Sequence, residues 1–196
     1  AILMGRLGTD ELAAHAVALQ CASLAFMVPL GLGIAATVRV GVAYGRKDIE
    51  GIRKAGWMSF LLGTGFMAVS ALTFILFGPA IVALFLDPTL PQNQAALVFA
   101  ATYLAIAGLF QLVDGAQVVA AHALRGLSDT KVPMLMAIFG YWFVGLPVAW
   151  LLGYVLDLHG VGIWLGLAAG LAFVAVLLVG RFALRERLGL LRNINA

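Results

Sequence analysis

The sequence predicts an all-α integral membrane protein, and three observations support this fold class. The chain is 63% hydrophobic and only 11% charged, whereas soluble domains carry about 25% charged residues; its mean hydropathy is +1.06. Several uncharged stretches reach the length of about 20 residues that a helix needs to cross a bilayer. The alternating segments of about ten residues that are typical of membrane strands are not visible.

We expect one partial and five complete membrane spans. The predicted segments are residues 1–5 (partial), 12–44, 55–78, 94–124, 132–155 and 161–184.

The first segment indicates a chain that begins within a helix, and the second is longer than a membrane span requires. Residues 1–5 are apolar and lack the charged region and cleavage site of a signal peptide, so we expect the sequence to be a piece of a longer protein. Residues 12–44 would form a helix of about 50 Å, which exceeds the thickness of the membrane. Pro29 removes a backbone hydrogen bond inside this stretch, so we predict a kink there and treat Pro29 as a candidate hinge.

The third and fourth segments are separated from their neighbours by polar loops. A charged loop at residues 45–54 precedes the span 55–78, which we expect to end before Pro79. Residues 87–93 contain two prolines and are predicted to be a loop. The span 94–124 follows.

The last two segments close the predicted bundle. The span 132–155 contains Pro147, which is the second candidate hinge. The span 161–184 leads into a basic tail. The chain is therefore expected to form a helical lobe in a lipid bilayer.

Basic residues alternate between the connecting segments. Eleven of the twelve lie in or beside the segments after spans 12–44, 94–124 and 161–184. By the positive-inside rule these segments and the C-terminus are expected to be cytoplasmic. The net charge of +3 thus reflects membrane topology, and no nucleic-acid partner is predicted.

The sequence contains no pattern typical of a cofactor site, a metal site or an enzyme. Cys21 is the single cysteine and sits in an apolar run. No HExxH motif, cysteine cluster or paired carboxylate appears. His15 and His122 are interpreted first as hydrogen-bonding residues near helix ends.

Asp114 is the strongest candidate for a functional residue. It lies well inside the span 94–124, with no other charge for about ten residues on either side. A carboxylate at this depth costs at least about 2.5 kcal/mol and usually marks an ion or proton path. It could exchange a proton or release one to admit Na⁺.

Gln111 and Gln117 flank Asp114 at a spacing of three residues and would form a polar stripe with it on an otherwise apolar helix. One interpretation is that the stripe forms interhelical hydrogen bonds, with Asp114 held neutral. The other is that these residues line a cavity around a cation-handling carboxylate. The high cost of burying Asp114 favours the second interpretation for that residue.

Several collinear segments resemble the multidrug and toxic compound extrusion (MATE) family, in particular its bacterial NorM-like branch. They are residues 7–15 (LGTDELAAH), 23–31 (SLAFMVPLG), 38–41 (VRVG, followed by Gly45 and Asp48), 114–120 (DGAQVVA), 124–130 (LRGLSDT), 140–142 (GYW) and 145–147 (GLP).

The resemblance implies a twelve-helix transporter of two six-helix lobes, in which residues 1–196 form the C-terminal lobe, helices seven to twelve, with the first helix truncated. It implies a multi-pass protein of the bacterial inner (plasma) membrane whose partners are the lipid bilayer, the missing N-terminal six-helix lobe and a small organic substrate.

In NorM-like members an acidic residue in the tenth helix binds the coupling cation, and Asp114 matches that position. A partner glutamate in the seventh helix would lie outside this chain. Some members have a tyrosine four residues before the aspartate; Phe110 stands there instead, so it is treated as a cavity-lining candidate without an oxygen ligand, which makes H⁺ more plausible than Na⁺.

The leading hypothesis is a secondary antiporter that exports organic, mostly cationic, drugs or toxic compounds in exchange for H⁺ or Na⁺. A related flippase for lipid-linked saccharides would be expected to have several basic residues at mid-membrane, which this sequence lacks. A non-transporting membrane scaffold is the third alternative.

Overall fold

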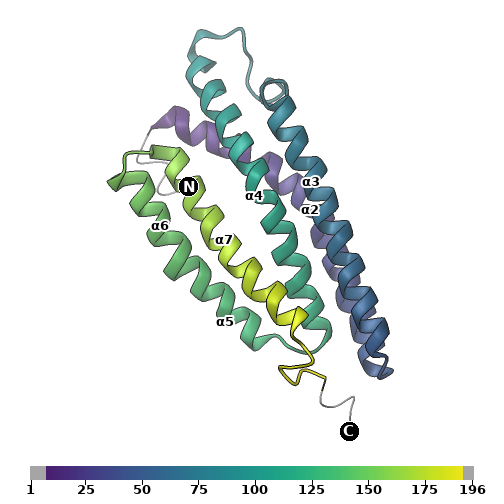
Figure 1. Ribbon diagram of the computed structural model, residues 1–196. Coiled ribbons are helices and arrows are strands. Elements are labelled where there is room, and N and C mark those ends of the chain that lie inside the picture. The colour runs from purple at the N-terminus through teal and green to yellow at the C-terminus, as the bar shows by residue number, and fades with distance from the viewer. Residues whose placement is uncertain (1–7, 192–196) are drawn as a thin grey trace.

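In the computed structural model, residues 8–191 are described and form a bundle of five long helical segments (Figure 1). In chain order they are α2 (Thr9–Gly45), α3 (Ile49–Val82), α4 (Gln94–Gly126, after the short η1, Pro91–Asn93), a composite fourth segment, and α7 (His159–Ala183). The fourth segment joins α5 (Lys131–Phe139), η2 (Gly140–Gly145), α6 (Leu146–Trp150) and η3 (Leu151–Val155).

All five segments are long and apolar enough to cross a membrane. The all-helical prediction is confirmed for these five, while the predicted partial span at residues 1–5 lies outside the described residues. Many large apolar side chains are exposed, such as Leu76 at 68% and Val176 at 72%. Such surfaces are suited to lipid rather than to water.

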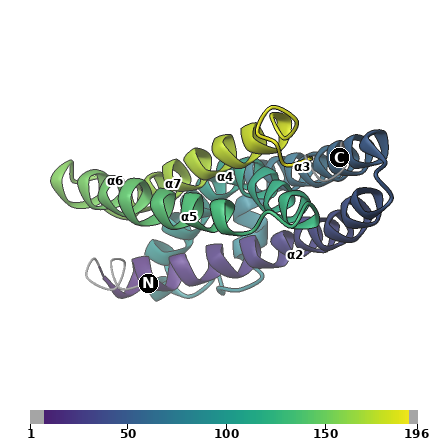
Figure 2. The ribbon, with the colours of Figure 1, turned by 90° about the horizontal axis from the view of Figure 1, so that it is seen from below.

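α4 is the central helix of the bundle. It packs against α2, α3 and α7, and Figure 2, seen from below, shows it between the α2–α3 side and the α5–α6 side. The composite fourth segment packs against α7 at one edge of the bundle.

The three basic connections lie at one end of the bundle. Figure 1 shows the α2–α3 connection, the α4–α5 turn and the C-terminal end of α7 together at the lower end. The basic residues that alternate along the sequence are thus gathered at one end of the bundle, which we call the basic end.

α3 differs from its predicted bounds at both ends. It starts at Ile49 because the Asp48 side chain accepts a hydrogen bond of 2.8 Å from the Gly51 backbone N–H and caps the helix. It continues through Pro79 to Val82 instead of ending at residue 78. Membrane helices tolerate an internal proline when neighbouring groups satisfy the freed backbone carbonyl.

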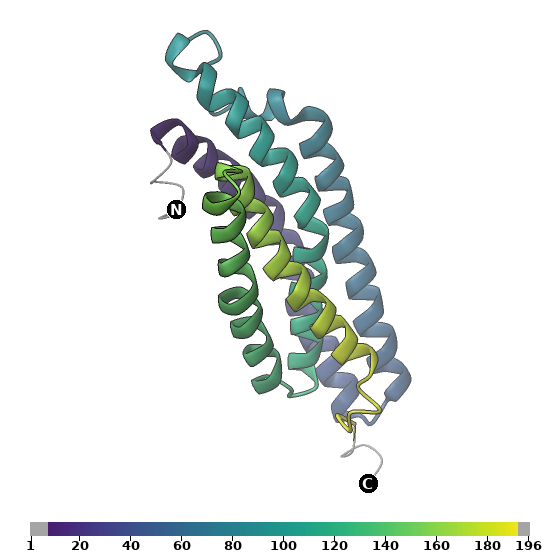
Figure 3. The ribbon, with the colours of Figure 1, turned by 60° about the vertical axis from the view of Figure 1, so that its left-hand side comes forward.

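α2 is one continuous helix through Pro29. Figures 1 and 3 show that it changes direction along its length without breaking. The proline therefore does not divide the predicted span into two helices.

The fourth segment alternates between α- and π-helical turns. Pro147 is the second residue of α6, which is flanked by the π-helical segments η2 and η3. Proline cannot donate a backbone hydrogen bond and its ring crowds the preceding turn, and a π-helical turn accommodates such a disruption. The wider turns give this segment irregular helical geometry on both sides of Pro147.

Glycines allow the fourth segment to approach α7 at backbone distance. A Cβ atom on Gly162 or Gly166 would overlap the backbone of Leu152 or Ala149. A Cβ atom on Gly170 would lie 2.8 Å from the Cα of Gly145. This small-residue stripe, spaced four residues apart, is typical of close helix pairs in membranes.

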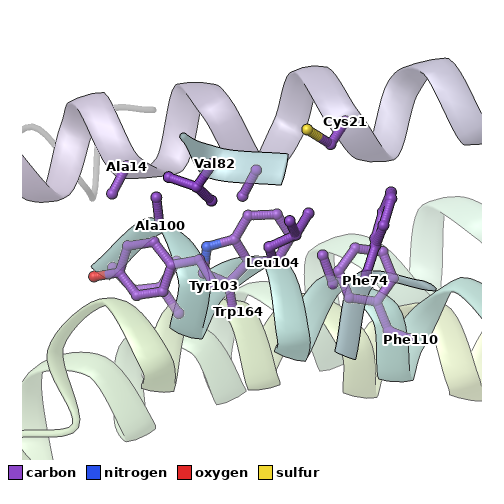
Figure 4. Close-up of a cluster of buried hydrophobic side chains, with 12 residues drawn as sticks. Ala14, Cys21, Phe74, Val82, Ala100, Tyr103, Leu104, Phe110 and Trp164 are labelled. Carbon is purple, nitrogen blue, oxygen red and sulfur yellow. The ribbon is translucent and has the colours of Figure 1, made fainter. Parts of the chain in front are cut away.

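One apolar cluster fills the bundle toward the end opposite the basic end (Figure 4). Its largest member, Trp164 of α7, is fully buried and stacks on Phe110 of α4 with ring centroids 5.4 Å apart. Cys21 is buried in the same cluster, in keeping with a packing role.

A largely buried ion pair fixes the turn after α4 to α7. Arg181 Nε donates to Asp129 Oδ2 at 2.6 Å, and the two side chains are only 15% and 11% exposed. We expect Asp129→Ala to lower the free energy of unfolding by about 3 kcal/mol, because it leaves a nearly buried guanidinium without its partner.

The matched control for this prediction is Glu50→Ala at the same end of the bundle. Glu50 pairs with Arg53, but those side chains are 51% and 58% exposed, and exposed pairs contribute little. Thermal unfolding of the full-length protein in detergent measures both effects. Equal changes in Tm would show that the Arg181 pair does not hold the turn.

Candidate functional site

Asp114 lies in the interior of α4, twelve residues before its end at Gly126. At 1.5 Å per residue this places it about 18 Å from the C-terminal end of the helix, which is near mid-membrane for a bilayer core of about 30 Å. Its side chain is half-buried. Among residues 8–191 it makes no ion pair.

Tyr141, from η2 of the fourth segment, lies within electrostatic range of the Asp114 carboxylate. The phenol interacts electrostatically with Asp114 and forms a side-chain hydrogen bond with Gln117. We call these three residues the Asp114 cluster. It combines one carboxylate, one amide and one hydroxyl, which are the oxygen-bearing groups that hard cations prefer.

Tyr141 was not among the site residues predicted from the sequence. It lies in residues 140–142, one of the segments that carry the family resemblance. A hydroxyl-bearing aromatic residue inside an apolar span, beside Gly140, was the available signal. Its pairing with α4 could not be read from the sequence because the two residues are distant in the chain.

Gln111 is not part of the Asp114 cluster. It is 1% exposed, and neither its amide oxygen nor its amide nitrogen has a hydrogen-bond partner among the described residues. The reason is helical geometry: at 100° per residue, three residues rotate the side chain by about 60°, so Gln111 and Gln117 differ by about 120° around α4. The predicted polar stripe is therefore split: Gln111 lies in the core, whereas Gln117 lies on the side of the fourth segment.

Phe110 lies in the apolar cluster against Trp164 and is 9% exposed. Here it is a packing residue, and a role in lining a cavity stays a prediction. Pro29 is buried in α2, and Pro147 lies in the same segment as Tyr141. Their roles as hinges also stay predictions.

The two histidines of the spans pack between helices. Thr37 Oγ1 lies 2.9 Å from the His122 carbonyl oxygen and 3.1 Å from His122 Nδ1. The Thr37 hydroxyl thus contacts both the backbone and the ring of His122, and the pair links α2 to α4. His15 instead packs edge-on to Trp164, with ring centroids 5.3 Å apart.

The comparison with protein families and the comparison with individual known proteins agree with each other. Residues 1–151 match the MatE family. The chain is 55% identical over 181 residues to the probable multidrug resistance protein NorM of Brucella suis biovar 1 (strain 1330), covering 92% of this chain and 38% of that protein. It is 50% identical over 184 residues to the multidrug resistance protein NorM of Burkholderia vietnamiensis, covering 94% of this chain and 40% of that protein.

Solved structures show the same fold. The crystal structure of the eukaryotic MATE transporter AtDTX14 superimposes with a TM-score of 0.81 at 21% identity, covering 93% of this chain and 40% of that one. An inward-facing MATE family transporter of the MOP superfamily gives a TM-score of 0.81 at 20% identity, over 95% of this chain and 41% of that one.

These relatives are membrane transporters rather than enzymes, and this chain spans about two fifths of the length of each. The family match covers well over half of the chain. The chain therefore belongs to the MATE family of multidrug efflux transporters, among the homologues of NorM.

Proposed function

We propose that this chain is the C-terminal lobe of a secondary antiporter that exports organic, mostly cationic, compounds in exchange for H⁺ or Na⁺. The observation that carries the proposal is Asp114, a half-buried carboxylate at membrane depth with no ion-pair partner in the described residues. Carboxylates in such positions are costly and generally mark ion pathways.

The lengths of the relatives support a two-lobe transporter. This chain covers 38% of the Brucella protein and 40% of the Burkholderia protein. The partner that completes the transport path would be an N-terminal six-helix lobe, which would contribute the remaining groups around the cation. The basic end of this lobe is expected to face the cytoplasm.

The Asp114 cluster suggests how the exchange would proceed. The ionised carboxylate attracts either the coupling ion or a cationic substrate, and binding of one neutralises the charge that holds the other. Gln117 and the Tyr141 hydroxyl, which are hydrogen-bonded to each other, would supply further oxygen atoms beside the carboxylate. Neutralising Asp114 would change its interaction with Tyr141.

The fourth segment is the element best placed to bend when the charge of Asp114 changes. Tyr141 lies in the π-helical η2, and Pro147 follows in α6. π-Helical turns and prolines are the usual sites of bending in helices. A change of charge at Asp114 would thus act on the least regular segment of the lobe, and Pro147 would serve as its hinge.

The full-length protein in proteoliposomes tests the proposal. We expect accumulation of the cationic dye ethidium when a pH gradient or a Na⁺ gradient is imposed, with the dye moving against the ion. Phe110 stands where some family members have a tyrosine and supplies no oxygen ligand for Na⁺, so H⁺ is the expected driving ion. No accumulation under either gradient would contradict the antiporter proposal.

The absence of basic residues from the middle of the bundle argues against the flippase alternative. Such a protein needs cationic side chains within the membrane to pair with phosphate, and residues 55–124 contain no lysine or arginine. Ion-driven movement of ethidium would also exclude a non-transporting scaffold.

A further inference from the structure

A groove at the basic end remains outside the proposed transport site. It has a volume of about 820 Å³ and runs between α2 and α3. Three basic side chains, Arg39, Arg46 and Lys54, lie along it toward the basic end, whereas Leu32 and Leu62 line its other end. We call it the basic groove.

The chemistry of the groove changes with depth. Leu32 precedes Arg46 by fourteen residues of α2, which is about 21 Å along the helix. Half of the hydrocarbon core is about 15 Å thick, with several more ångströms of headgroup region. The groove therefore extends from the headgroup level to near mid-membrane, charged at its outer end and apolar within.

The apolar part is open to a ligand. Met58 is 55% exposed and Leu62 is 54% exposed on the α3 wall, and Val38 and Val42 are 59% and 49% exposed on the α2 wall. These positions recur every three or four residues along each helix, so they form one continuous strip on each wall. A flexible hydrocarbon chain would fit between the two strips.

The charges at the outer end are not neutralised within the groove. Neither Arg39 nor Arg46 forms an ion pair in the part of the chain that the structure describes. Asp48 is the acidic residue of the lining; it caps α3 by accepting the Gly51 N–H and forms no ion pair with either arginine. Lys54 lies 3.6 Å from Glu50. Two guanidinium groups thus remain available to an anion.

We infer that the basic groove binds one anionic phospholipid, with its phosphate between Arg39 and Arg46 and an acyl chain along Val42, Met58 and Leu62. Basic pockets between membrane helices on the positively charged side are suited to anionic headgroups, and arginine forks match phosphate oxygens. A soluble phosphate would leave the apolar strips unused. This inference does not depend on the transport role of Asp114.

Native mass spectrometry of the full-length protein tests the inference with palmitoyl-oleoyl phosphatidylglycerol as the probe and the phosphatidylcholine of the same chains as the comparison. We expect one preferred phosphatidylglycerol adduct. The double variant Arg39→Gln, Arg46→Gln should weaken it about 25-fold, because each basic group near an anionic headgroup contributes roughly a factor of five.

Two variants keep the result interpretable. Arg53→Gln removes a neighbouring basic side chain that pairs with Glu50 and does not line the groove, so it should leave the adduct unchanged. Arg39→Lys with Arg46→Lys keeps both charges and should retain most of the binding. Equal binding of the two lipids, or undiminished binding by the double glutamine variant, would overturn the inference. Absence of any adduct would also overturn it, since another part of the protein would then cover the groove.

Discussion

Asp114→Asn in the full-length protein is expected to reduce ion-driven ethidium transport to the level of empty liposomes. Asparagine has nearly the same size as aspartate, but it cannot take up a proton or carry the negative charge that attracts a cation. The substitution therefore removes the exchange step and leaves the packing of α4 unchanged. Transport in proteoliposomes with an imposed pH or Na⁺ gradient measures the loss.

A measurement of Tm distinguishes this loss of transport from misfolding. A charged aspartate at the centre of a membrane helix costs about 2.5 kcal/mol or more, so we expect the asparagine variant to have the same Tm as the parent protein or a higher one. Asp157→Asn is the matched control, because Asp157 is an exposed loop residue whose positive φ of 51° asparagine also adopts. Full ion-driven transport by Asp114→Asn would remove Asp114 from the mechanism.

Gly166→Ala is expected to produce a large loss of stability. The new Cβ atom would overlap the backbone of Ala149 in α6, and a backbone cannot move aside as the end of a flexible side chain can. Separating α6 from α7 would also disturb the neighbouring contact between Gly170 and Gly145. Overpacking of this kind costs about 3 kcal/mol, which should appear as a lower Tm and a smaller yield of monodisperse protein.

Gly180→Ala supplies the control on the same helix. A Cβ atom on Gly180 meets nothing within 4 Å, and alanine favours a helix over glycine by about 1 kcal/mol. This variant should be as stable as the parent protein or more so. If the two alanine variants had the same Tm, the close approach of α6 and α7 would not be a source of stability.

The contrast between Gly166 and Gly180 shows a limit of sequence analysis. Both are glycines in one apolar helix, and the sequence alone gives no reason to distinguish them. Their difference arises from the position of α6, which is fixed by contacts across the bundle. The same limit applies to the ion pair of Asp129 with Arg181, whose members are 52 residues apart.

Gln111 and Gln117 show the limit at the candidate site. The sequence placed both on a stripe with Asp114, and their helical spacing was correctly predicted. A stripe at every third residue nevertheless turns around the helix, and only the neighbours of α4 determine which member reaches the core. Gln117 contacts Tyr141, whereas Gln111 is buried away from it.

The sequence by itself determined the membrane class, five of the helical segments, the basic end and the unusual carboxylate at Asp114. These features depend on composition, on the length of apolar runs and on the position of charges along one helix, and all of these are local properties of the chain. The tertiary structure decided that Tyr141 interacts with Asp114, that glycines bring α6 against α7, and that α2 and α3 form a basic groove between them. These features depend on how each helix is rotated and packed against residues far away in the sequence, and a local pattern does not contain that information.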